Sequence, residues 1–116
     1  MARARQGQVY VATIGGRIGF ARDPVAPGPI VLVVQGNVLN EILDTVQVVP
    51  LVPAAEAPRF SLNVAVAGDE LGRADHVALV HLARALALSR LQPGPLAAVA
   101  QPTLERVLTM LSRVFS

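Results

Sequence analysis

Two short apolar runs dominate the first half of the chain, Ile30 to Val34 and Val46 to Val52. Both are rich in β-branched residues, and a polar segment of helical character, Asn37 to Leu43, separates them. Runs this short and this continuously apolar are typical of strands buried on both faces. We therefore predict that they form the walls of one small core, with any chemistry at their ends. Asn37 is a suitable N-cap for the helical segment between them.

Alternation of apolar and polar positions predicts two further strands. In Gln8 to Thr13, Val9 and Val11 fall on one face, while Tyr10 and Ala12 fall on the other. The clearest alternation in the chain is Phe60 to Val66, which indicates a half-buried antiparallel strand. Between the first strand and the apolar run at Ile30, glycines and prolines predict a long loop from about Ile14 to Pro29.

The C-terminal third contains one clear helix and one ambiguous segment. Pro102 suits the first position of a helix that runs to Phe115, and the predicted apolar stripe of this helix consists of Leu104, Val107, Leu108, Leu111, Val114 and Phe115. His76 to Leu91 is helical by residue propensity, although its first residues suit a strand equally well. A run of strands closed by one helix predicts a mostly β fold, namely a small antiparallel barrel with a C-terminal helix.

Composition limits the class of protein. The 116 residues suit a single domain, residues 1–116, and 53% hydrophobic with 16% charged residues excludes a disordered chain. A body this small buries only about 60–70% of its surface alone, so we expect a homo-oligomer. The chain has no cysteine, which excludes disulfides and thiolate metal sites.

Location and charge follow from the same sequence. The basic N-terminus leads into no apolar segment of the signal-peptide type. The longest near-apolar stretch, Val77 to Leu88, is too short to span a membrane, so we expect a cytoplasmic protein with no membrane partner. All ten basic residues are arginine. Arginine is well suited to bidentate phosphate contacts, although GC-rich coding explains the same composition.

Candidate chemistry is sparse. The segment Gly15 to Gly19 is rich in glycine but lacks the ending of a phosphate-binding loop. Two histidines alone do not make a zinc site, so we expect no metal and no other cofactor. His81 lies three residues before Arg84, and both would reach one phosphate if the preceding apolar run ends at an open groove. The histidine would then move a proton and the arginine would stabilise charge. The alternative is a hydrogen-bonded, half-buried histidine beside a surface arginine.

The order and spacing of these segments resemble the MazF/PemK family of toxins from bacterial toxin–antitoxin modules. The first strand of the family matches Gly7-Gln8-Val9-Tyr10-Val11-Ala12, and its second matches Gly28-Pro29-Ile30-Val31-Leu32-Val33. A polar turn with an asparagine, supplied by Asn37 or Asn40, precedes Val46-Gln47-Val48-Val49-Pro50-Leu51-Val52. A later strand matches His81-Leu82-Ala83-Arg84-Ala85-Leu86, and the turn after it matches Leu88-Ser89-Arg90-Leu91.

The resemblance implies an SH3-like barrel of the CcdB/MazF type that works as a homodimer and is bound by a cognate antitoxin peptide. It implies that Val77 to Leu86 is mostly strand, against its helical propensity. It also implies an endoribonuclease that cuts single-stranded mRNA at short sequences without a metal ion, by attack of a ribose 2′-hydroxyl on the neighbouring phosphate.

Several functional positions of the family carry other residues here. The usual arginine falls at Gly28, the usual threonine or serine at Val52, and a loop histidine near Phe20. An acidic residue falls at His81, and Arg84 alone matches a polar family position. We therefore predict a rebuilt site with Arg84, His81 and Arg22 as catalytic residues. The positions assigned to substrate binding are Arg17, Phe20, Gly28 and Val52.

Two other hypotheses remain open at this stage. The first is a non-enzymatic protein on the same barrel that binds an antitoxin or a protein target. The second is an unrelated small barrel.

Overall fold

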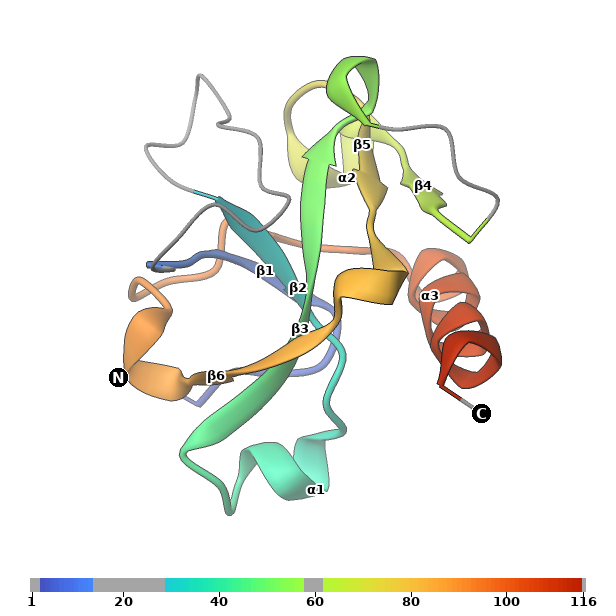
Figure 1. The fold of residues 1–116 in the computed structure, drawn as a ribbon. Coiled ribbons are helices and arrows are strands. Elements are labelled where there is room, and N and C mark those ends of the chain that lie inside the picture. Colours follow the sequence, from blue (N-terminus) through green and yellow to red (C-terminus); the bar gives the residue numbers. More distant parts are fainter. Residues whose placement is uncertain (1–2, 14–28, 58–61, 116) are drawn as a thin grey trace.

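The computed structural model describes residues 3–13, 29–57 and 62–115, which build one curled antiparallel sheet and a C-terminal helix (Figure 1). The strands are β1 (Gln8–Val11), β2 (Ile30–Val33), β3 (Thr45–Pro53), β4 (Val64–Val66), β5 (His76–Ala78), β6 (Arg84–Ala87) and β7 (Ala97–Ala98). The helices are α1 (Asn37–Asn40), α2 (Gly68–Leu71) and α3 (Gln101–Val114), with short 3₁₀ turns η1 (Ala54–Glu56), η2 (Val80–Leu82) and η3 (Leu88–Arg90).

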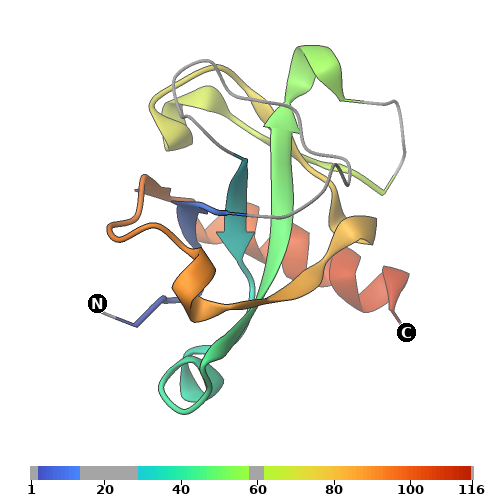
Figure 2. The same ribbon diagram turned by 60° about the vertical axis from the view of Figure 1, so that its left-hand side comes forward.

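Strand β3 is the centre of the sheet. It pairs along one edge with β2, and its other edge pairs first with β6, from Thr45 to Val48, and then with β5, from Leu51 to Pro53. The path through the sheet is β4-β5-β3-β2-β1-β7, with β6 beside β3. A bridge between Ala12 and Leu91 brings the segment after β6 back against β1, so the sheet curls into a half-barrel (Figures 1 and 2).

The two apolar runs are buried on both faces, as predicted. Alternate residues of β1, β2 and β3 enter two separate clusters, because successive side chains of a strand point to opposite faces. The cluster on the inner side, here called the barrel face, contains Tyr10, Ala12, Val31, Val33, Val46, Val48, Leu86 and Leu91. The opposite side, here called the helix face, contains Val9, Val11, Ile30, Leu32, Val49, Leu51 and Val107, the last of which belongs to α3. Gln47 is the exception within the second run, because it is exposed.

Helix α3 packs on the helix face through most of the predicted stripe. Leu104 and Val107 are buried, whereas Phe115 is 61% exposed at the C-cap. Glu70 of α2 fixes the start of the helix by accepting hydrogen bonds from the Ala100 N–H (2.7 Å) and the Thr103 hydroxyl (2.8 Å). The helix begins at Gln101, one residue earlier than predicted, which still leaves Pro102 in the first turn.

Gly68 at the start of α2 explains the position of Glu70. A Cβ atom on Gly68 would lie 2.1 Å from the Arg73 carbonyl oxygen, so only glycine fits there. The Gly68 N–H donates to the Asp75 carboxylate at 2.6 Å, which closes the turn. This tight loop carries Glu70 to the N-terminus of α3.

Three sequence predictions were wrong in part. The N-cap of α1 is Gly36 rather than Asn37, and α1 ends at Asn40 rather than Leu43. Of the strand predicted from Phe60 to Val66, only Val64–Val66 is strand; Leu62 and Asn63 are not, and Phe60 and Ser61 lie outside the described residues.

The segment His76 to Leu91 forms β5, η2, β6 and η3 rather than a helix. The expectation that Val77 to Leu86 is mostly strand is correct for five of the ten residues, Val77, Ala78 and residues 84–86, because η2 and its two flanking residues interrupt the strands. Pairing of both strands with β3 outweighs the local helical preference.

Candidate functional site

Arg84 begins β6 and lies on the barrel face. It stands opposite Val48, and directly opposed residues of an antiparallel pair share a face. Its side chain is half-buried, whereas the neighbours on that face, Val46, Val48 and Leu86, are fully buried. No hydrogen bond or ion pair joins the guanidinium of Arg84 to another residue of the described chain. The guanidinium is therefore a cation at the rim of an otherwise apolar surface.

His81 lies in the middle of η2, the turn between β5 and β6. The turn is closed by hydrogen bonds from the Leu82 N–H to the Leu79 carbonyl (2.9 Å) and from the Ala83 N–H to the Val80 carbonyl (3.1 Å). Val80 is buried and η2 contacts α3, so the turn is held firmly while the imidazole of His81 is exposed. The alternative was a half-buried histidine beside a surface arginine. The structure shows the reverse burial, with His81 exposed and Arg84 half-buried.

Val52 lies further along β3, on the same face as Arg84. It is 3% exposed and pairs with Val77 of β5. Four residues separate Val52 from Val48, the partner of Arg84, which corresponds to about 13 Å along a strand. The structure therefore places Arg84 and Val52 on one face but not side by side, and Val52 brings no polar group.

The remaining predicted positions, Arg17, Phe20, Arg22 and Gly28, lie outside the described residues. The boundary residues of that segment are described. The Pro29 carbonyl accepts a hydrogen bond from the Ala12 N–H at 2.9 Å, and the adjacent Ile30 pairs with Leu51, the neighbour of Val52.

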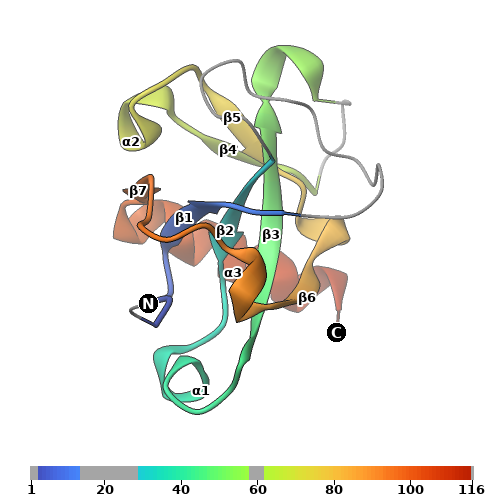
Figure 3. The same cartoon turned by 90° about the vertical axis from the view of Figure 1, so that its left-hand side faces the viewer.

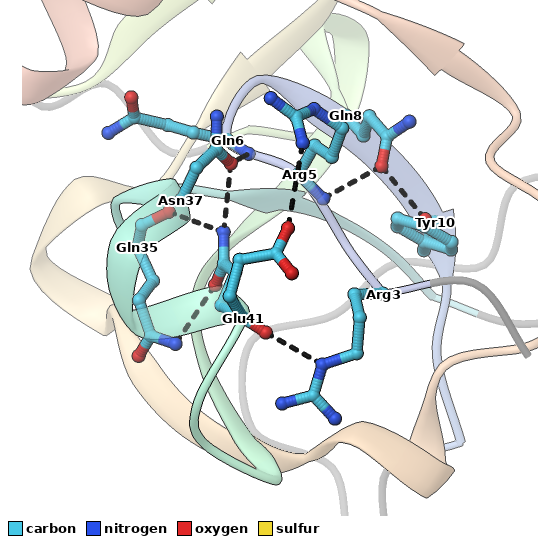
Figure 4. A network of polar contacts seen from close by, with 9 residues as sticks. Arg3, Arg5, Gln6, Gln8, Tyr10, Gln35, Asn37 and Glu41 are labelled. Carbon is cyan, nitrogen blue, oxygen red and sulfur yellow. Dashed lines mark hydrogen bonds and ion pairs between the residues drawn. The ribbon is translucent and has the colours of Figure 1, made fainter.

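A network of polar side chains, which includes Arg3 and Arg5, lies beside α1 (Figure 4). Asn40 is buried; its amide nitrogen donates to the Gln35 carbonyl (2.8 Å) and to Asn37 Oδ1 (3.2 Å), and its Oδ1 accepts from Gln35 Nε2 (2.9 Å). Asn37 Oδ1 also accepts from the Gln6 N–H at 2.8 Å. Both asparagines proposed for the family's polar turn therefore hold that turn together.

Arg3 completes this network from the N-terminal segment. Its Nε donates to the Asn40 carbonyl at 2.8 Å, while its two terminal nitrogens donate to the Leu43 carbonyl and to the Asp44 carboxylate. Arg5 adds a weaker ion pair to Glu41 at 3.8 Å. Charged donors near the end of a short helix satisfy carbonyls that have no partner within the helix. The network is structural.

Sequence reasoning missed a groove between β4 and α3. It has a volume of about 580 Å³ and is lined by Asn63, Val64, Ala65, Pro102, Glu105, Arg106, Thr109, Met110 and Arg113. The only signal in the sequence was the polar side of the helix opposite its apolar stripe, which carries Arg106, Thr109 and Arg113. The alternation predicted for 60–66 did not indicate that β4 would border a groove.

Neither a metal cluster nor a membrane span was found within the described part of the chain. No group of three or more histidine or acidic side chains is suitably placed for a metal ion among the residues described. No helix in residues 3–13, 29–57 and 62–115 is long and apolar enough to cross a membrane.

Comparisons with known proteins agree with this architecture. Residues 5–115 match the family described as PemK-like, MazF-like toxin of type II toxin–antitoxin system. A search of curated proteins finds no match to the sequence.

Solved structures give the same result for the fold. A mycobacterial endoribonuclease in complex with its cognate antitoxin superposes with a TM-score of 0.76 at 19% identity, over 97% of this chain and 94% of that one. MazF from Deinococcus radiodurans gives 0.76 at 17% identity, over 99% and 98%. Mycobacterium tuberculosis toxin MazF-mt6 gives 0.72 at 12% identity, over 93% and 95%. At these identities the likeness concerns the fold, whereas the family match spans nearly the whole sequence. The chain belongs to the PemK-like, MazF-like toxins of type II toxin–antitoxin systems.

Proposed function

We propose that this protein is an endoribonuclease toxin that cuts single-stranded RNA at short sequences without a metal ion. Its family membership and a fold shared with proteins named as endoribonucleases support the proposal. The observation that carries it is Arg84, which keeps its charge at the one polar family position that this chain matches, and whose guanidinium has no hydrogen-bond or ion-pair partner among the described residues. The active site is then rebuilt around Arg84 and His81, with Arg22 as a third member.

The proposed reaction requires three groups. The ribose 2′-hydroxyl attacks the adjacent phosphorus, the P–O5′ bond breaks, and a 2′,3′-cyclic phosphate and a free 5′-hydroxyl result. A base must take the hydroxyl proton, an acid must supply a proton to the leaving oxygen, and a cation must stabilise the charged intermediate. The exposed imidazole of His81 suits proton transfer. Arg84, with its planar fork of donors, suits the phosphate oxygens.

Cleavage is tested with purified protein and a long single-stranded RNA in excess chelator. We expect cuts at one short recurring sequence, with cyclic phosphate ends. Parallel preparations of Arg84→Ala and His81→Ala control for contaminating ribonuclease, since a contaminant would cut equally in all three. Intact RNA at high protein concentration would overturn the proposal.

A second candidate is a toxin or binding protein on the same fold that engages a protein target. The observation that favours it is Val52, where a buried aliphatic side chain stands at the family's threonine or serine position. Growth arrest that survives the double substitution of Arg84 and His81, with cellular RNA unchanged, would support this candidate over cleavage.

The homodimer expected from sequence has a suitable surface on the helix face. Thr45, Gln47, Ala85 and Ala87 are exposed on the stretch of β3 and β6 that precedes the buried half of the sheet. Beside it, a hollow of about 280 Å³ is lined by Val34, Gln47, Ala83, Leu111 and Phe115. Small side chains allow close approach of a second copy, and the exposed Phe115 ring would fill a pocket on it. Sedimentation of Phe115→Asp as a monomer, against a dimer for the parent protein, is the expected result.

The other partners follow from the same proposal. We infer that residues 1–116 form one domain, that it acts in the cytoplasm, and that a cognate antitoxin peptide neutralises it. In solved structures, MazF of Deinococcus radiodurans is complexed with MazE. A short acidic polypeptide encoded beside this chain would be the matching partner.

A further inference from the structure

Helix α1 and the turn after it have the reverse of the usual amphipathic arrangement. The buried side chain of α1 is Asn40, whereas the exposed side chains are aliphatic. Val38 is 77% exposed and Ile42 is 67% exposed, and Leu39 and Leu43 are exposed as well. These four aliphatic residues are here called the α1 patch. A surface helix normally buries its apolar side, so the α1 patch contributes little to the core of its own chain.

Hydrogen bonds hold the corner that carries the α1 patch. The Asn40 N–H donates to the Gly36 carbonyl at 3.1 Å, and the Leu43 N–H donates to the Leu39 carbonyl at 2.8 Å. Arg3 donates to the Asn40 carbonyl at 2.8 Å (Figure 4) and also to the Leu43 carbonyl. Because this backbone is already fixed, a partner that covers the patch does not have to order it, and less conformational entropy is lost on binding.

The charges around the α1 patch cancel within one copy. Arg3 pairs with Asp44 at 3.2 Å, and Arg5 pairs with Glu41 at 3.8 Å. A surface without net charge does not attract RNA, an anionic lipid or a charged peptide. It also does not repel an identical surface, which a two-fold contact brings face to face with it. Charge therefore favours a second copy of the chain as the occupant.

The size of the α1 patch sets the strength of such a contact. Four aliphatic side chains at these exposures amount to roughly 300–400 Å², the size of the largest apolar patch on a typical monomer. Two patches face to face would bury roughly 700 Å², which is below the area of about 1,200 Å² that a stable interface needs. We therefore expect a weak contact, with a dissociation constant between about 10 μM and 1 mM.

The α1 patch is separate from the hollow and the phenylalanine of the proposed dimer surface. Figure 3 shows α1 at the lower end of the sheet on the side of the N-terminus, whereas the C-terminal end of α3 lies on the other side. Phe115 is the C-cap of α3, and none of the four patch residues lines the hollow beside it. A copy bound at the α1 patch would leave Phe115 uncovered.

We propose that the α1 patch binds the α1 patch of a second copy in a two-fold contact, and that this contact joins homodimers into tetramers at high protein concentration. Burial of aliphatic side chains drives the association. The contact does not depend on the proposed nuclease function, so variants with and without RNA cleavage should assemble alike.

The test uses the full chain in analytical ultracentrifugation from about 1 μM to 1 mM, the range in which a contact of this size associates. We expect the average mass to rise from that of a dimer toward that of a tetramer. Val38→Asp and Ile42→Asp place two carboxylates against each other across the contact, so each should weaken the association at least about tenfold. Ala55→Asp is the matched control, because Ala55 is exposed on η1, which follows β3 at the end opposite α1.

Phe115→Asp separates this contact from the proposed dimer surface. The variant should be a monomer when dilute and should form dimers through the α1 patch when concentrated, whereas the double variant with Ile42→Asp should stay a monomer. Added sodium chloride should not weaken the association, because no ion pair drives it. Cooling should weaken it, as expected for hydrophobic contact. Failure of Phe115→Asp to dissociate when dilute would concern the dimer surface alone.

Three results would overturn the inference. One is a constant mass up to about 1 mM, the weakest range of specific association. The second is association of equal strength in Val38→Asp, Ile42→Asp and the parent protein. The third is binding of uncharged phosphatidylcholine vesicles that is lost in Val38→Asp, since a lipid surface would then be the occupant. Urea denaturation of each variant confirms that the compared proteins are folded.

Discussion

Arg3 and Arg84 are both partly buried arginines, but their surroundings are opposite. Arg3 directs its donors at the Asn40 and Leu43 carbonyls and the Asp44 carboxylate. In the same corner Gln35, Asn37 and Gln6 also take part in hydrogen bonds (Figure 4). Arg84 stands among valines and a leucine, and no residue of the described ranges accepts a hydrogen bond from its guanidinium. All three guanidinium nitrogens of Arg3 donate to acceptors of the fold, whereas the guanidinium of Arg84 has no acceptor among the described residues. The hydrogen-bond partners of an arginine, rather than the residue type, therefore distinguish a structural cation from a candidate catalytic one.

The two regions also differ in what surrounds the cation. The α1 corner is polar and joins the N-terminal segment to the turn before β3 (Figure 3). The rim around Arg84 is apolar, so a phosphate bound there would lose water around its charge and interact more strongly with the guanidinium. Four predictions test this contrast, in order of decreasing effect.

The largest effect is expected for Arg84→Ala on RNA cleavage. Loss of the cation that stabilises the charged intermediate should lower the cleavage rate by about a hundredfold or more. The free energy of unfolding should change by less than about 0.5 kcal/mol, because the guanidinium has no hydrogen-bond or ion-pair partner to lose among the described residues. Single-turnover cleavage and urea denaturation of the same samples measure both. An unchanged rate would remove Arg84 from the site.

Asn40→Ala should give the opposite result. The substitution leaves the Gln35 carbonyl without its donor in a buried place, which costs about 2 kcal/mol of stability. The midpoint of urea denaturation should fall with an unchanged slope. Cleavage per folded molecule should stay at the parent level. Loss of activity with unchanged stability would mean that the α1 corner belongs to the functional site.

Arg3→Ala should show a smaller loss of the same kind, about 1 kcal/mol, since the released carbonyls lie near water. The ion pair with Asp44 contributes little, because that carboxylate is 94% exposed. Arg90→Ala serves as the matched control, with one long hydrogen bond of 3.3 Å to the Thr13 carbonyl. Equal stability of the two variants would contradict the role given to Arg3.

The smallest effect is a pH dependence that originates in Tyr10. Burial raises the pKa of the Tyr10 phenol above its ordinary value of 10.0, and the hydroxyl donates to Gln8 Oε1 at 2.9 Å. The folded state then keeps the proton to higher pH than the unfolded chain does. The stabilisation is complete below pH 10 and is lost as the pH rises through the folded-state pKa.

The composition of the chain allows the effect of Tyr10 on stability near pH 10 to be measured without interference from other side chains. Tyr10 is the only tyrosine, and lysine and cysteine are absent, so no other side chain has an ordinary pKa near 10. Denaturation midpoints across this range should decline for the parent protein and stay flat for Tyr10→Phe. The same decline in both proteins would assign the titration to another group.

The sequence determined the strands around the core, their faces and the terminal helix. Alternation in Gln8–Val11 and continuous apolarity in Ile30–Val33 are local properties that fix which side chains point to which cluster, and the structure follows them. Family resemblance placed Arg84 on a strand and assigned Val52 to the same site, and the two lie on one face of the sheet four strand positions apart. The sequence did not predict the contacts of the polar side chains, because those contacts join residues far apart in the chain.

Residue propensity gave the wrong conformation for residues 76 to 91, where the family resemblance alone indicated strands, and only the tertiary structure decided the roles of the polar residues. Helical propensity in that segment is worth only tenths of a kcal/mol per residue, whereas the edge of β3 offers a row of backbone partners that β5 and β6 satisfy. Likewise, nothing near Asn40 or Arg3 in the sequence distinguishes them from Asn37 or Arg84. The distinction comes from burial and from acceptors brought together by folding, about 40 residues away in the case of Arg3.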